Sequence, residues 1–333
     1  MSIQQVALGK TGPSVSRIGL GAMGMSNAYG ATDDAESIAT IHAAIDGGVN
    51  LIDTGDFYGA GHNEILIGRA LRQRNRDDVV LSVKFGALRS PDGAFVGFDT
   101  RPAAIKNFLG HTLTRLGVDH VDIYRPARLD PSVPIEDTVG AIAEMVDAGY
   151  VRHIGLSEMG SDTIRRAAAV HPIVDLQIEY SLITRGIETD ILSTTRELGI
   201  DITAYGVLSR GLLSDTFRGN IQFAPDDFRA HSPRFQGENL SKNRALVEAL
   251  ATIADARGVT VAQLAIAWVL AQGDDIVPVI GARKVARMKE SLEALDIRLT
   301  SDELTTIEAK IPADAAAGER YAADQMAALD SER

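Results

Sequence analysis

Short apolar runs alternate with amphipathic stretches along this chain, and the alternation constrains the fold more than any other feature. The apolar runs lie at residues 18–20, 50–53, 79–85, 121–124, 151–157, 173–180, 201–205 and 275–280. Stretches with helical spacing separate them; in the first, Asp33 or Asp34 can cap the helix and Gly47 can end it. Eight strand-helix units in 333 residues predict an α/β fold, a (β/α)8 TIM barrel formed by residues 1–333 as a single domain.

Two segments fall outside the eight units. Before Ile18, the turn sequence LGKTG lies between short β-like runs, which predicts a β-hairpin capping one end of the barrel. After the seventh strand, residues 206–240 contain scattered Phe, Pro and Gly with little periodicity. Loops of this length in compact domains often cover active sites, so we interpret it as a lid, the alternative being a surface excursion.

The charge and the absence of cysteine narrow the classes of partner. The net charge of -12 would repel nucleic acid and anionic lipid, and no basic run is dense enough to offset it. The most apolar helical stretch, residues 259–272, is too short to span a bilayer. With no cysteine, the chain has no disulfide or thiolate chemistry, which fits a reducing compartment; we expect a cytoplasmic protein.

The sequence GLGAMG at residues 19–24 matches the glycine pattern of dinucleotide-binding Rossmann folds. In that fold the glycine loop runs directly into a helix, whereas here SNAYGATDD intervenes before helical spacing begins. We therefore interpret these glycines as positions where the backbone approaches a ligand at the end of the first strand.

Polar residues follow the predicted strands at the end where barrel enzymes carry their chemistry. They are Asp53, Tyr58, Lys84, Ser157, Glu158, Gln177, Glu179 and Tyr205. An ammonium at Lys84 would lower the pKa of Tyr58 from about 10, and Asp53 would keep Lys84 charged. Tyr58 could then act as a general acid, but none of these groups can deliver a hydride, so a bound cofactor must supply it.

Three cations follow the last strand: Arg283, Lys284 and Arg287 lie in the first turns of a predicted helix. Cations at a helix N-terminus oppose the helix dipole, so this placement suits phosphate binding better than stability.

At this point the chain resembles the aldo-keto reductases, from the predicted hairpin to the last helix. The motifs that carry the resemblance are GLGAMGMS, DTGDFYG, GHNEILIGRAL, VKFG, HIGLSE, LQIEYS, AYGVLSRGLL, DDFRAHSPRFQGENL and IGARKVARMKES. The resemblance implies an NADPH-dependent reductase of aldehydes and ketones that needs no metal. Tyr58 would be its proton donor, with Lys84 and Asp53 tuning it.

The resemblance also implies roles in cofactor binding. Ser157 and Gln177 would bind the nicotinamide carboxamide, Tyr205 would stack on the nicotinamide ring, and Leu208, Ser209 and Arg210 would cover the pyrophosphate. Gly281, Arg283 and Arg287 would hold the adenosine 2'-phosphate, which favours NADP(H). Glu158 and Ser291 stand where many members have Asn.

The stretch VDIYRPARLD, residues 121–130, departs from the family pattern. Ala127 stands where the family carries a catalytic histidine that orients the substrate carbonyl. Losing one such donor typically costs about 10² to 10³ in rate, so activity would survive. By strand parity Arg125 faces the same side as Ala127 and could be a substitute donor or pair with Glu158; alternatively it leaves the barrel or pairs structurally with an Asp.

Two further interpretations of function stay open. One is an NADPH-binding sensor or regulatory protein on a weakly active barrel, and the other is an NADP-dependent alcohol or sugar dehydrogenase. The small-molecule carbonyl substrate would be selected by Met25, Tyr29, Phe57, Phe85, Leu88 and the long loop. The sequence leaves the substrate's identity, the direction of the reaction and the oligomeric state open.

Overall fold

Eight parallel strands close into a barrel in the computed structural model, which describes residues 3–72, 74–219, 221–225 and 227–333. The barrel strands are β3 (Gly19–Gly21), β4 (Leu51–Gly55), β5 (Val80–Phe85), β8 (Val121–Pro126), β9 (Val151–Ser157), β10 (Ile173–Glu179), β11 (Asp201–Tyr205) and β12 (Ile276–Gly281). They pair in chain order, and pairing of β12 with β3 closes the ring. The predicted TIM barrel is confirmed, and every predicted strand overlaps one of these eight.

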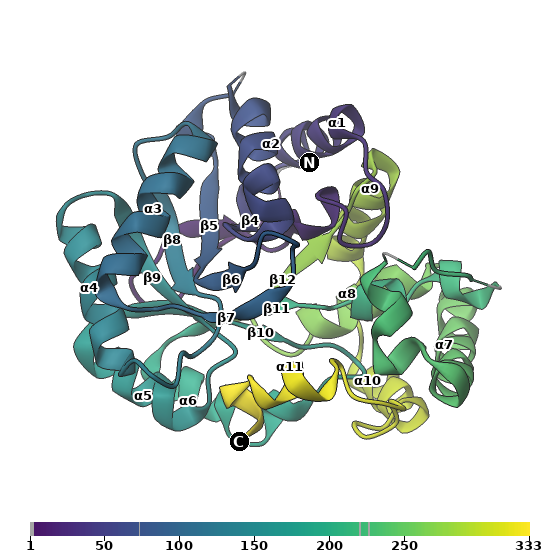
Figure 1. Ribbon diagram of the computed structural model, residues 1–333. Coiled ribbons are helices and arrows are strands. Elements are labelled where there is room, and N and C mark those ends of the chain that lie inside the picture. The colour runs from purple at the N-terminus through teal and green to yellow at the C-terminus, as the bar shows by residue number, and fades with distance from the viewer. Residues whose placement is uncertain (1–2, 73, 220, 226) are drawn as a thin grey trace.

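Helices surround the barrel (Figure 1). Those between or after the strands are α1 (Asp34–Asp46), α2 (His62–Leu71), α3 (Pro102–Leu116), α4 (Ile135–Asp147), α5 (Ser161–Val170), α6 (Ile191–Leu198), α7 (Gly237–Arg257), α8 (Val261–Leu270) and α9 (Val285–Glu293), followed by α10 (Ser301–Lys310) and α11 (Ala323–Ala327). Asp33 caps α1 by accepting a hydrogen bond from the backbone of Glu36, and Gly47 follows its last turn, as expected.

The most apolar stretch of the chain forms α8, which begins with a capping box between Thr260 and Gln263 and is buried along nearly its whole length. In the described part of the chain, no single helix is long and apolar enough to cross a membrane; α7 and α8 pass that test only as a pair, with an 89° bend between them.

The predicted N-terminal hairpin is formed by β1 (Gln5–Ala7) and β2 (Ser14–Ser16), which pair antiparallel. Leu8 and Val15 pack with Val174 and Val277, near the starts of β10 and β12. The Arg17 guanidinium donates to the carbonyl of Ile276 at 3.2 Å. The hairpin therefore closes the N-terminal end of the barrel and leaves the opposite end for the site.

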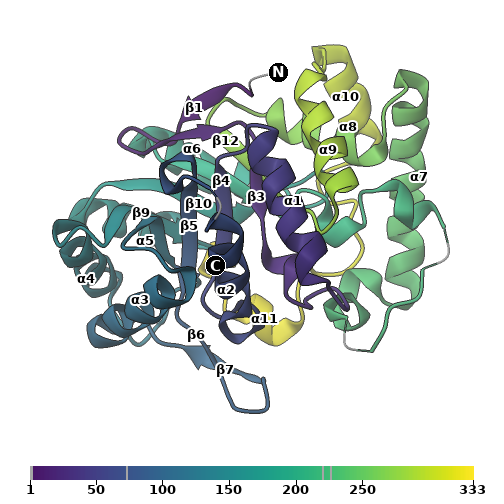
Figure 2. The ribbon, with the colours of Figure 1, turned by 90° about the horizontal axis from the view of Figure 1, so that it is seen from above.

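A second hairpin, β6 (Ala87–Arg89) with β7 (Phe95–Phe98), follows β5 and was not predicted. Its sequence signal is Pro91–Asp92–Gly93, a turn in which Gly93 has a φ of 85°. Figure 2 shows the two hairpins at opposite ends of the barrel, so β6 and β7 stand at the rim where the strands finish.

The long segment after β11 has little regular structure, as its sequence indicated. It forms single 3-10 turns at Ser209–Gly211, Asp215–Arg218, Phe228–His231 and Pro233–Phe235 before α7 begins. An aromatic cluster joins these turns: the rings of Phe217 and Phe235 are 5.6 Å apart, and Phe223 packs on both. The segment therefore has a core of its own beside the end of β11.

Candidate active site

Asp53, Lys84 and Tyr58 meet at the C-terminal end of the barrel, as the sequence predicted. Asp53 lies in the middle of β4, next to the strand β5 that carries Lys84, and the Asp53 Oδ1 to Lys84 Nζ distance is 2.5 Å. Both side chains are buried. The Lys84 ammonium lies 5.1 Å from the centre of the Tyr58 ring. Tyr58 opens a tight turn in which Gly59, Ala60 and Gly61 have positive φ, and the turn fixes the ring over the strand ends.

The protonation of Tyr58 differs from the expectation. Burial and then the negative charge of Asp53 raise the pKa of Tyr58 well above its usual value, so the net lowering expected from Lys84 is wrong. Burial also lowers the pKa of Lys84 to about 8, against the opposing effect of Asp53. At neutral pH the phenol keeps its proton and most Lys84 side chains remain charged.

Gln177 and Ser82 hold the second carboxylate oxygen of Asp53. The Gln177 amide and the Ser82 hydroxyl each donate to Asp53 Oδ2 at 2.8 Å. The amide of Gln177 is therefore turned toward Asp53, which leaves its carbonyl oxygen for any other partner. The sequence indicated Gln177 as a site residue, but the contribution of Ser82 was missed.

Arg125 does not act as a substitute donor, because both terminal nitrogens of its guanidinium are bound to other side chains inside the barrel. Its guanidinium forms an ion pair with Asp175 at 2.8 Å and donates to Ser82 at 2.9 Å and Thr203 at 3.2 Å. The side chain is 0% exposed. The interpretations in which Arg125 replaces the family histidine or pairs with Glu158 are wrong, and the structural pairing with an Asp is what the structure contains.

Ala127 and Arg128 stand at the end of β8 beside this site. Ala127 is 2% exposed, and its amide donates to the carbonyl of Phe85 at 2.8 Å. The Arg128 guanidinium turns back and donates to the carbonyl of Ala127 at 2.6 Å, and within the described residues it forms no ion pair. Burial raises the pKa of Tyr58 and of Tyr205, and the charge of Arg128 opposes both rises. Sequence reasoning overlooked this half-buried cation.

The segment after α10, residues 311–333 and here called the C-terminal tail, enters the site. Sequence reasoning also missed this contribution. Arg320 donates to both carboxylate oxygens of Glu158, each at 2.7 Å, and both side chains are buried. Burial opposes the charged carboxylate, yet the Arg320 cation holds the pKa of Glu158 at about 2. The Tyr205 hydroxyl donates to Glu158 at 2.6 Å and lies 2.9 Å from the Tyr321 hydroxyl. The tail is thus fixed across the ends of β9 and β11.

The residues expected to cover the pyrophosphate follow β11. Ser209 and Arg210 adopt positive φ values of 43° and 57°, and the Arg210 guanidinium lies 3.2 Å from Glu179 and 4.5 Å above the Tyr321 ring. Leu208 packs against the core beside them. This strained turn aims Arg210 at the strand ends.

The residues expected to hold the 2'-phosphate follow β12. Gly281 ends that strand and is exposed. Arg283 donates to the carbonyl of Tyr29 at 2.9 Å, which ties the loop after β3 to the start of α9. Arg287 pairs with Glu290 at 2.8 Å and is about half exposed.

Two orphaned polar atoms test whether this end of the barrel fits a nicotinamide dinucleotide. Ser157 Oγ and Arg210 Nη1 are buried and have no hydrogen-bond partner among the described residues. Buried polar groups without partners are costly, and a bound ligand is one way to complete their bonding. A hydroxyl suits the carboxamide of nicotinamide and a guanidinium suits a phosphate, so these residues fit the cofactor.

The residues expected to select the substrate are not all placed where they could contact it. Phe57 packs edge-on against Tyr58, with ring centres 4.8 Å apart, and Tyr29 is half-buried. Leu88 lies on the half-buried hairpin strand β6, and Met25 is fully buried in the main core. Phe85 was wrongly assigned: because Lys84 points into the barrel, Phe85 points out, where it stacks on Tyr124 at 4.3 Å.

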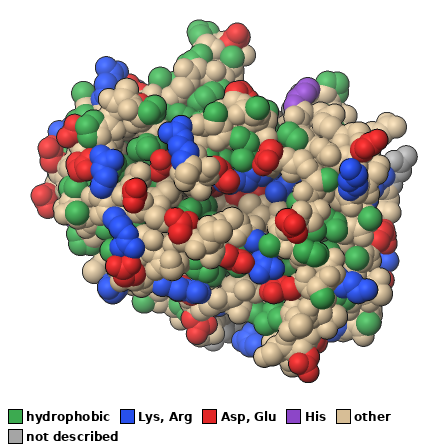
Figure 3. All heavy atoms as spheres, turned by 90° about the horizontal axis from the view of Figure 1, so that it is seen from below, with side chains coloured by type: hydrophobic (Ala, Val, Ile, Leu, Met, Phe, Trp, Pro, Cys, Tyr) green, Lys and Arg blue, Asp and Glu red, His purple; other side chains and the backbone are tan. Residues whose placement is uncertain are grey.

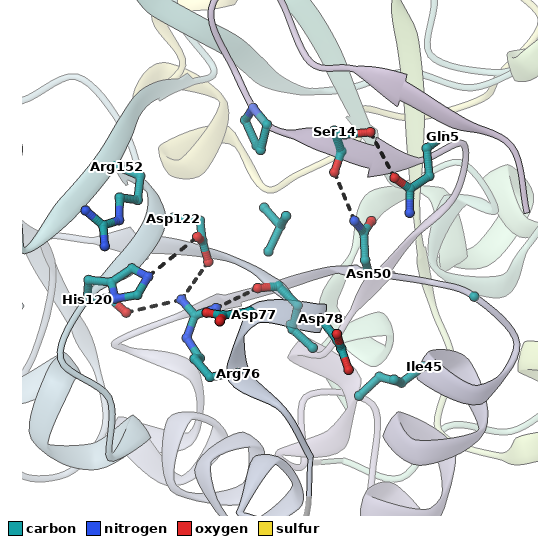
Figure 4. Close-up of a pocket in the computed structure, with 14 residues that line it drawn as sticks. Gln5, Ser14, Ile45, Asn50, Arg76, Asp77, Asp78, His120, Asp122 and Arg152 are labelled. Carbon is teal, nitrogen blue, oxygen red and sulfur yellow. Dashed lines mark hydrogen bonds and ion pairs between the residues drawn. The ribbon is translucent and has the colours of Figure 1, made fainter.

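A cavity of about 720 Å³ lies at the other end of the barrel (Figure 4). Its polar walls bind one another: Arg76 pairs with Asp122 at 2.6 Å, and Asp122 also accepts from the backbone of Leu81 at 2.8 Å. A smaller cavity, about 340 Å³, lies between β7, the loop after β8 and the tail. Leu129 and Asp130, which follow Arg128 in the sequence, line the smaller one.

Comparisons with known proteins agree with this geometry. The model of the "Aldo/keto reductase family" matches residues 17–312. "Probable aldo-keto reductase 1" from Glycine max is 42% identical over 324 residues, covering 96% of this chain and 92% of that protein. The glycerol dehydrogenase AKR11B4 from Gluconobacter oxydans has a TM-score of 0.83 at 30% identity, covering 94% of this chain and 97% of that chain.

An aldo-keto reductase from Klebsiella pneumoniae, solved in complex with NADPH, has a TM-score of 0.73 at 26% identity and covers 94% of this chain and 96% of that chain. The family match extends over nearly the whole barrel and includes the ends of all eight strands. The chain therefore belongs to the aldo/keto reductase family and is an oxidoreductase that uses NADP(H).

Proposed function

We propose that Tyr58 supplies the proton when this protein reduces the carbonyl of an aldehyde or ketone with NADPH. The observation that carries the proposal is the buried ion pair of Asp53 with Lys84. Lys84 Nζ lies 2.5 Å from Asp53 Oδ1 and 5.1 Å from the centre of the Tyr58 ring. The bound cofactor supplies the hydride in such a reaction. The protein must then supply a proton to the carbonyl oxygen, and Tyr58 keeps its proton at neutral pH.

Lys84 and Asp53 would stabilise Tyr58 after it has given its proton to the carbonyl oxygen. A phenolate in a buried site is costly, and an ammonium close to its ring offsets part of that cost. Asp53 keeps the ammonium in place by an ion pair that is itself buried. These separate roles explain why a carboxylate, an amine and a phenol are grouped at the C-terminal end of the barrel.

The cofactor would bind across the ends of β9 to β12. We assign Ser157 and the free carbonyl of Gln177 to the carboxamide and Tyr205 to stacking on the nicotinamide ring. Leu208, Ser209 and Arg210 are assigned to the pyrophosphate, and Gly281, Arg283 and Arg287 to the 2'-phosphate. The unpartnered atoms of Ser157 and Arg210 support this placement.

The substrate would lie between Tyr58 and the rim formed by Phe57, Tyr29 and Leu88. Since Ala127 offers no side-chain donor, Arg128 is our candidate for the group that binds the carbonyl oxygen. Its guanidinium is already at the Ala127 backbone, and a cation without an ion pair suits an oxygen that gains negative charge.

Alcohol oxidation with NADP is the second candidate. A neighbour at 30% identity is a glycerol dehydrogenase, and the same three residues would serve when Tyr58 accepts the proton instead of giving it. A sensor without turnover has less support, because a pure sensor needs no buried Asp53–Lys84 pair beneath a phenol.

Tyr58→Phe should lower kcat about 10³-fold, because it removes the proton donor and leaves the ring. The dissociation constant of NADPH should stay unchanged. The loss of NADPH absorbance with a panel of aldehydes measures kcat, and fluorescence titration of the cofactor measures the dissociation constant. If bound NADPH in the wild-type protein is oxidised by none of the aldehydes, the sensor interpretation replaces ours.

The kcat/KM for carbonyl reduction should fall above a pH of about 8. The pKa of Lys84 is lowered to about 8 by burial, so its charged form is present below that pH and lost above it. The measurement is kcat/KM against pH for wild type and Lys84→Met. Only the wild type should show the decrease above pH 8, which is the alkaline limb of the profile. A wild-type profile that stays flat well above pH 8 contradicts the role of Lys84.

Arg283→Ala should weaken NADPH binding about tenfold while NADH binding changes little, because only NADPH carries the 2'-phosphate. Arg101→Ala, which removes an exposed arginine paired with Asp99 at the start of α3, is the matched control. Equal losses for the two cofactors would show that Arg283 acts only by holding the loop after β3.

Arg128→Met should lower kcat at least tenfold, since it removes the proposed donor to the carbonyl oxygen. Ala127→His in the Arg128→Met background should recover part of that loss, because an imidazole there can donate to the same oxygen. Single-turnover rates with a neutral aldehyde measure both effects. Wild-type rates in Arg128→Met would remove Arg128 from the site.

A further inference from the structure

Arg125 and Asp175 form a buried ion pair in the barrel interior, and Arg125 is the strand neighbour of Lys84. Arg125 Nη1 lies 2.8 Å from Asp175 Oδ2, and the Thr203 hydroxyl donates to the same oxygen at 2.5 Å. Neither side chain of the pair is exposed to solvent. An arginine is expensive to bury and never loses its charge, so a barrel that keeps one in its interior needs a compensating anion, which Asp175 provides.

The barrel makes room for this pair at Gly155 on β9, the strand between β8 and β10. A Cβ atom at Gly155 would lie 2.5 Å from Asp175 Oδ1 and 3.1 Å from both the Nε and the Cζ of Arg125. The two side chains therefore meet across the surface of β9, where only glycine leaves the space. Three neighbouring strands take part, which makes the pair a feature of the barrel rather than of one loop.

A hydrogen-bonded path leads from this pair to the proposed catalytic group. Arg125 Nη2 donates to Ser82 Oγ at 2.9 Å, and Ser82 Oγ donates to Asp53 Oδ2 at 2.8 Å. A guanidinium can only donate, so Ser82 must accept from Arg125. The single hydroxyl proton of Ser82 is then directed at Asp53, which leaves Asp53 Oδ1 for Lys84.

The path also balances charge in a space that water does not reach. Asp53 and Asp175 are the carboxylates of this group, and Lys84 and Arg125 its cations, all on side chains that are at most 7% exposed. Burial raises the pKa of Asp175, and the charge of Arg125 opposes that rise. In an interior of low dielectric constant these four charges act on one another strongly. Removing one would change the protonation of the others.

Resting on the function proposed above, we propose that Arg125, held by Asp175, is a positioning residue that orients Asp53 and Lys84 through Ser82. It touches neither substrate nor cofactor in this role. Its contribution is to fix which oxygen of Asp53 meets Lys84 and to place a permanent cation beneath the lysine.

Several charged and titratable groups face Lys84. Asp53 comes from β4, Tyr58 from the turn that follows it, Arg125 from β8, Arg128 from the loop after β8, and Asp175 from β10 by way of Arg125. Burial lowers the pKa of Lys84 to about 8; Asp53 opposes this, and Arg125 and Arg128 reinforce it. Loss of the Arg125 charge should therefore raise the pKa of Lys84.

The test is a pH profile of kcat/KM for a good aldehyde in the double variant Arg125→Gln/Asp175→Asn, which keeps the interior neutral and hydrogen-bonded. Its alkaline limb should move upward relative to wild type, because Arg125 is the strand neighbour of Lys84 and lowers the pKa of Lys84, whereas Asp175 reaches Lys84 only by way of Arg125. Arg125→Lys keeps the charge, so its limb should stay close to that of wild type. Ser82→Ala keeps all four charges but cuts the path, so its kcat should fall about tenfold with NADPH binding unchanged.

The matched control is Glu64→Gln/Arg115→Gln, which neutralises another ion pair with a buried carboxylate, between α2 and α3, without contact to Asp53. Its limb should coincide with that of wild type. An unshifted limb in Arg125→Gln/Asp175→Asn overturns the inference; if that variant does not fold, wild-type kcat in Ser82→Ala overturns it. Lys84→Met separates the proposals: if it loses the limb while Arg125→Gln/Asp175→Asn leaves the limb unshifted, only the inference about Arg125 fails, whereas a limb retained in Lys84→Met contradicts the role of Lys84 itself.

Discussion

Compensation of buried charge is the constraint on which this active site depends. Lys84 and Arg125 lie in the barrel interior, where water cannot solvate them, and each has a carboxylate at hydrogen-bonding distance. The strand register brings this about: Lys84 and Arg125 are direct neighbours on β5 and β8, and Asp53 is the neighbour of Ser82 on β4 and β5. A barrel with a different register could not balance these charges.

The same rule extends to the rim. Glu158 and Glu179 are buried carboxylates, and the cations that meet them come from distant parts of the chain: Arg320 from the tail and Arg210 from the segment after β11. The rim therefore depends on segments that are not part of the repeating barrel. Figure 3 shows the contrast with one outer face, where acidic and basic side chains are intermingled in contact with solvent.

The barrel and the catalytic group were predictable because both follow from local patterns. The alternation of apolar runs with stretches of helical spacing located the eight strands. Polar residues near the C-terminal ends of parallel strands gather at one end of a barrel, so Asp53, Tyr58 and Lys84 could be predicted to lie together. Parity could also have excluded Phe85, since its neighbour Lys84 faces inward. The direction of Arg125 along the barrel axis was not predictable, because it depends on the space above Gly155 in another strand.

The tail was out of reach for a different reason. Arg320 and Tyr321 lie in an Ala-rich stretch with no pattern that indicates a buried arginine, and the carboxylate that binds Arg320 is 162 residues away. Arg128 was visible in the stretch VDIYRPARLD, but no role was assigned to it. A long-range pair such as Arg320 with Glu158 comes from the folded geometry alone.

The anchoring of the tail has a practical consequence for producing this protein. Ser331, close to the last residue, donates a hydrogen bond to Glu158 at 2.7 Å, and the same carboxylate positions the hydroxyl of Tyr205. An affinity tag fused after Arg333 would start next to these contacts and would disturb the hydrogen bonds of Ser331 and Tyr205 to Glu158. A tag at the other terminus would extend from the β1–β2 hairpin, with the whole length of the barrel between it and Tyr58.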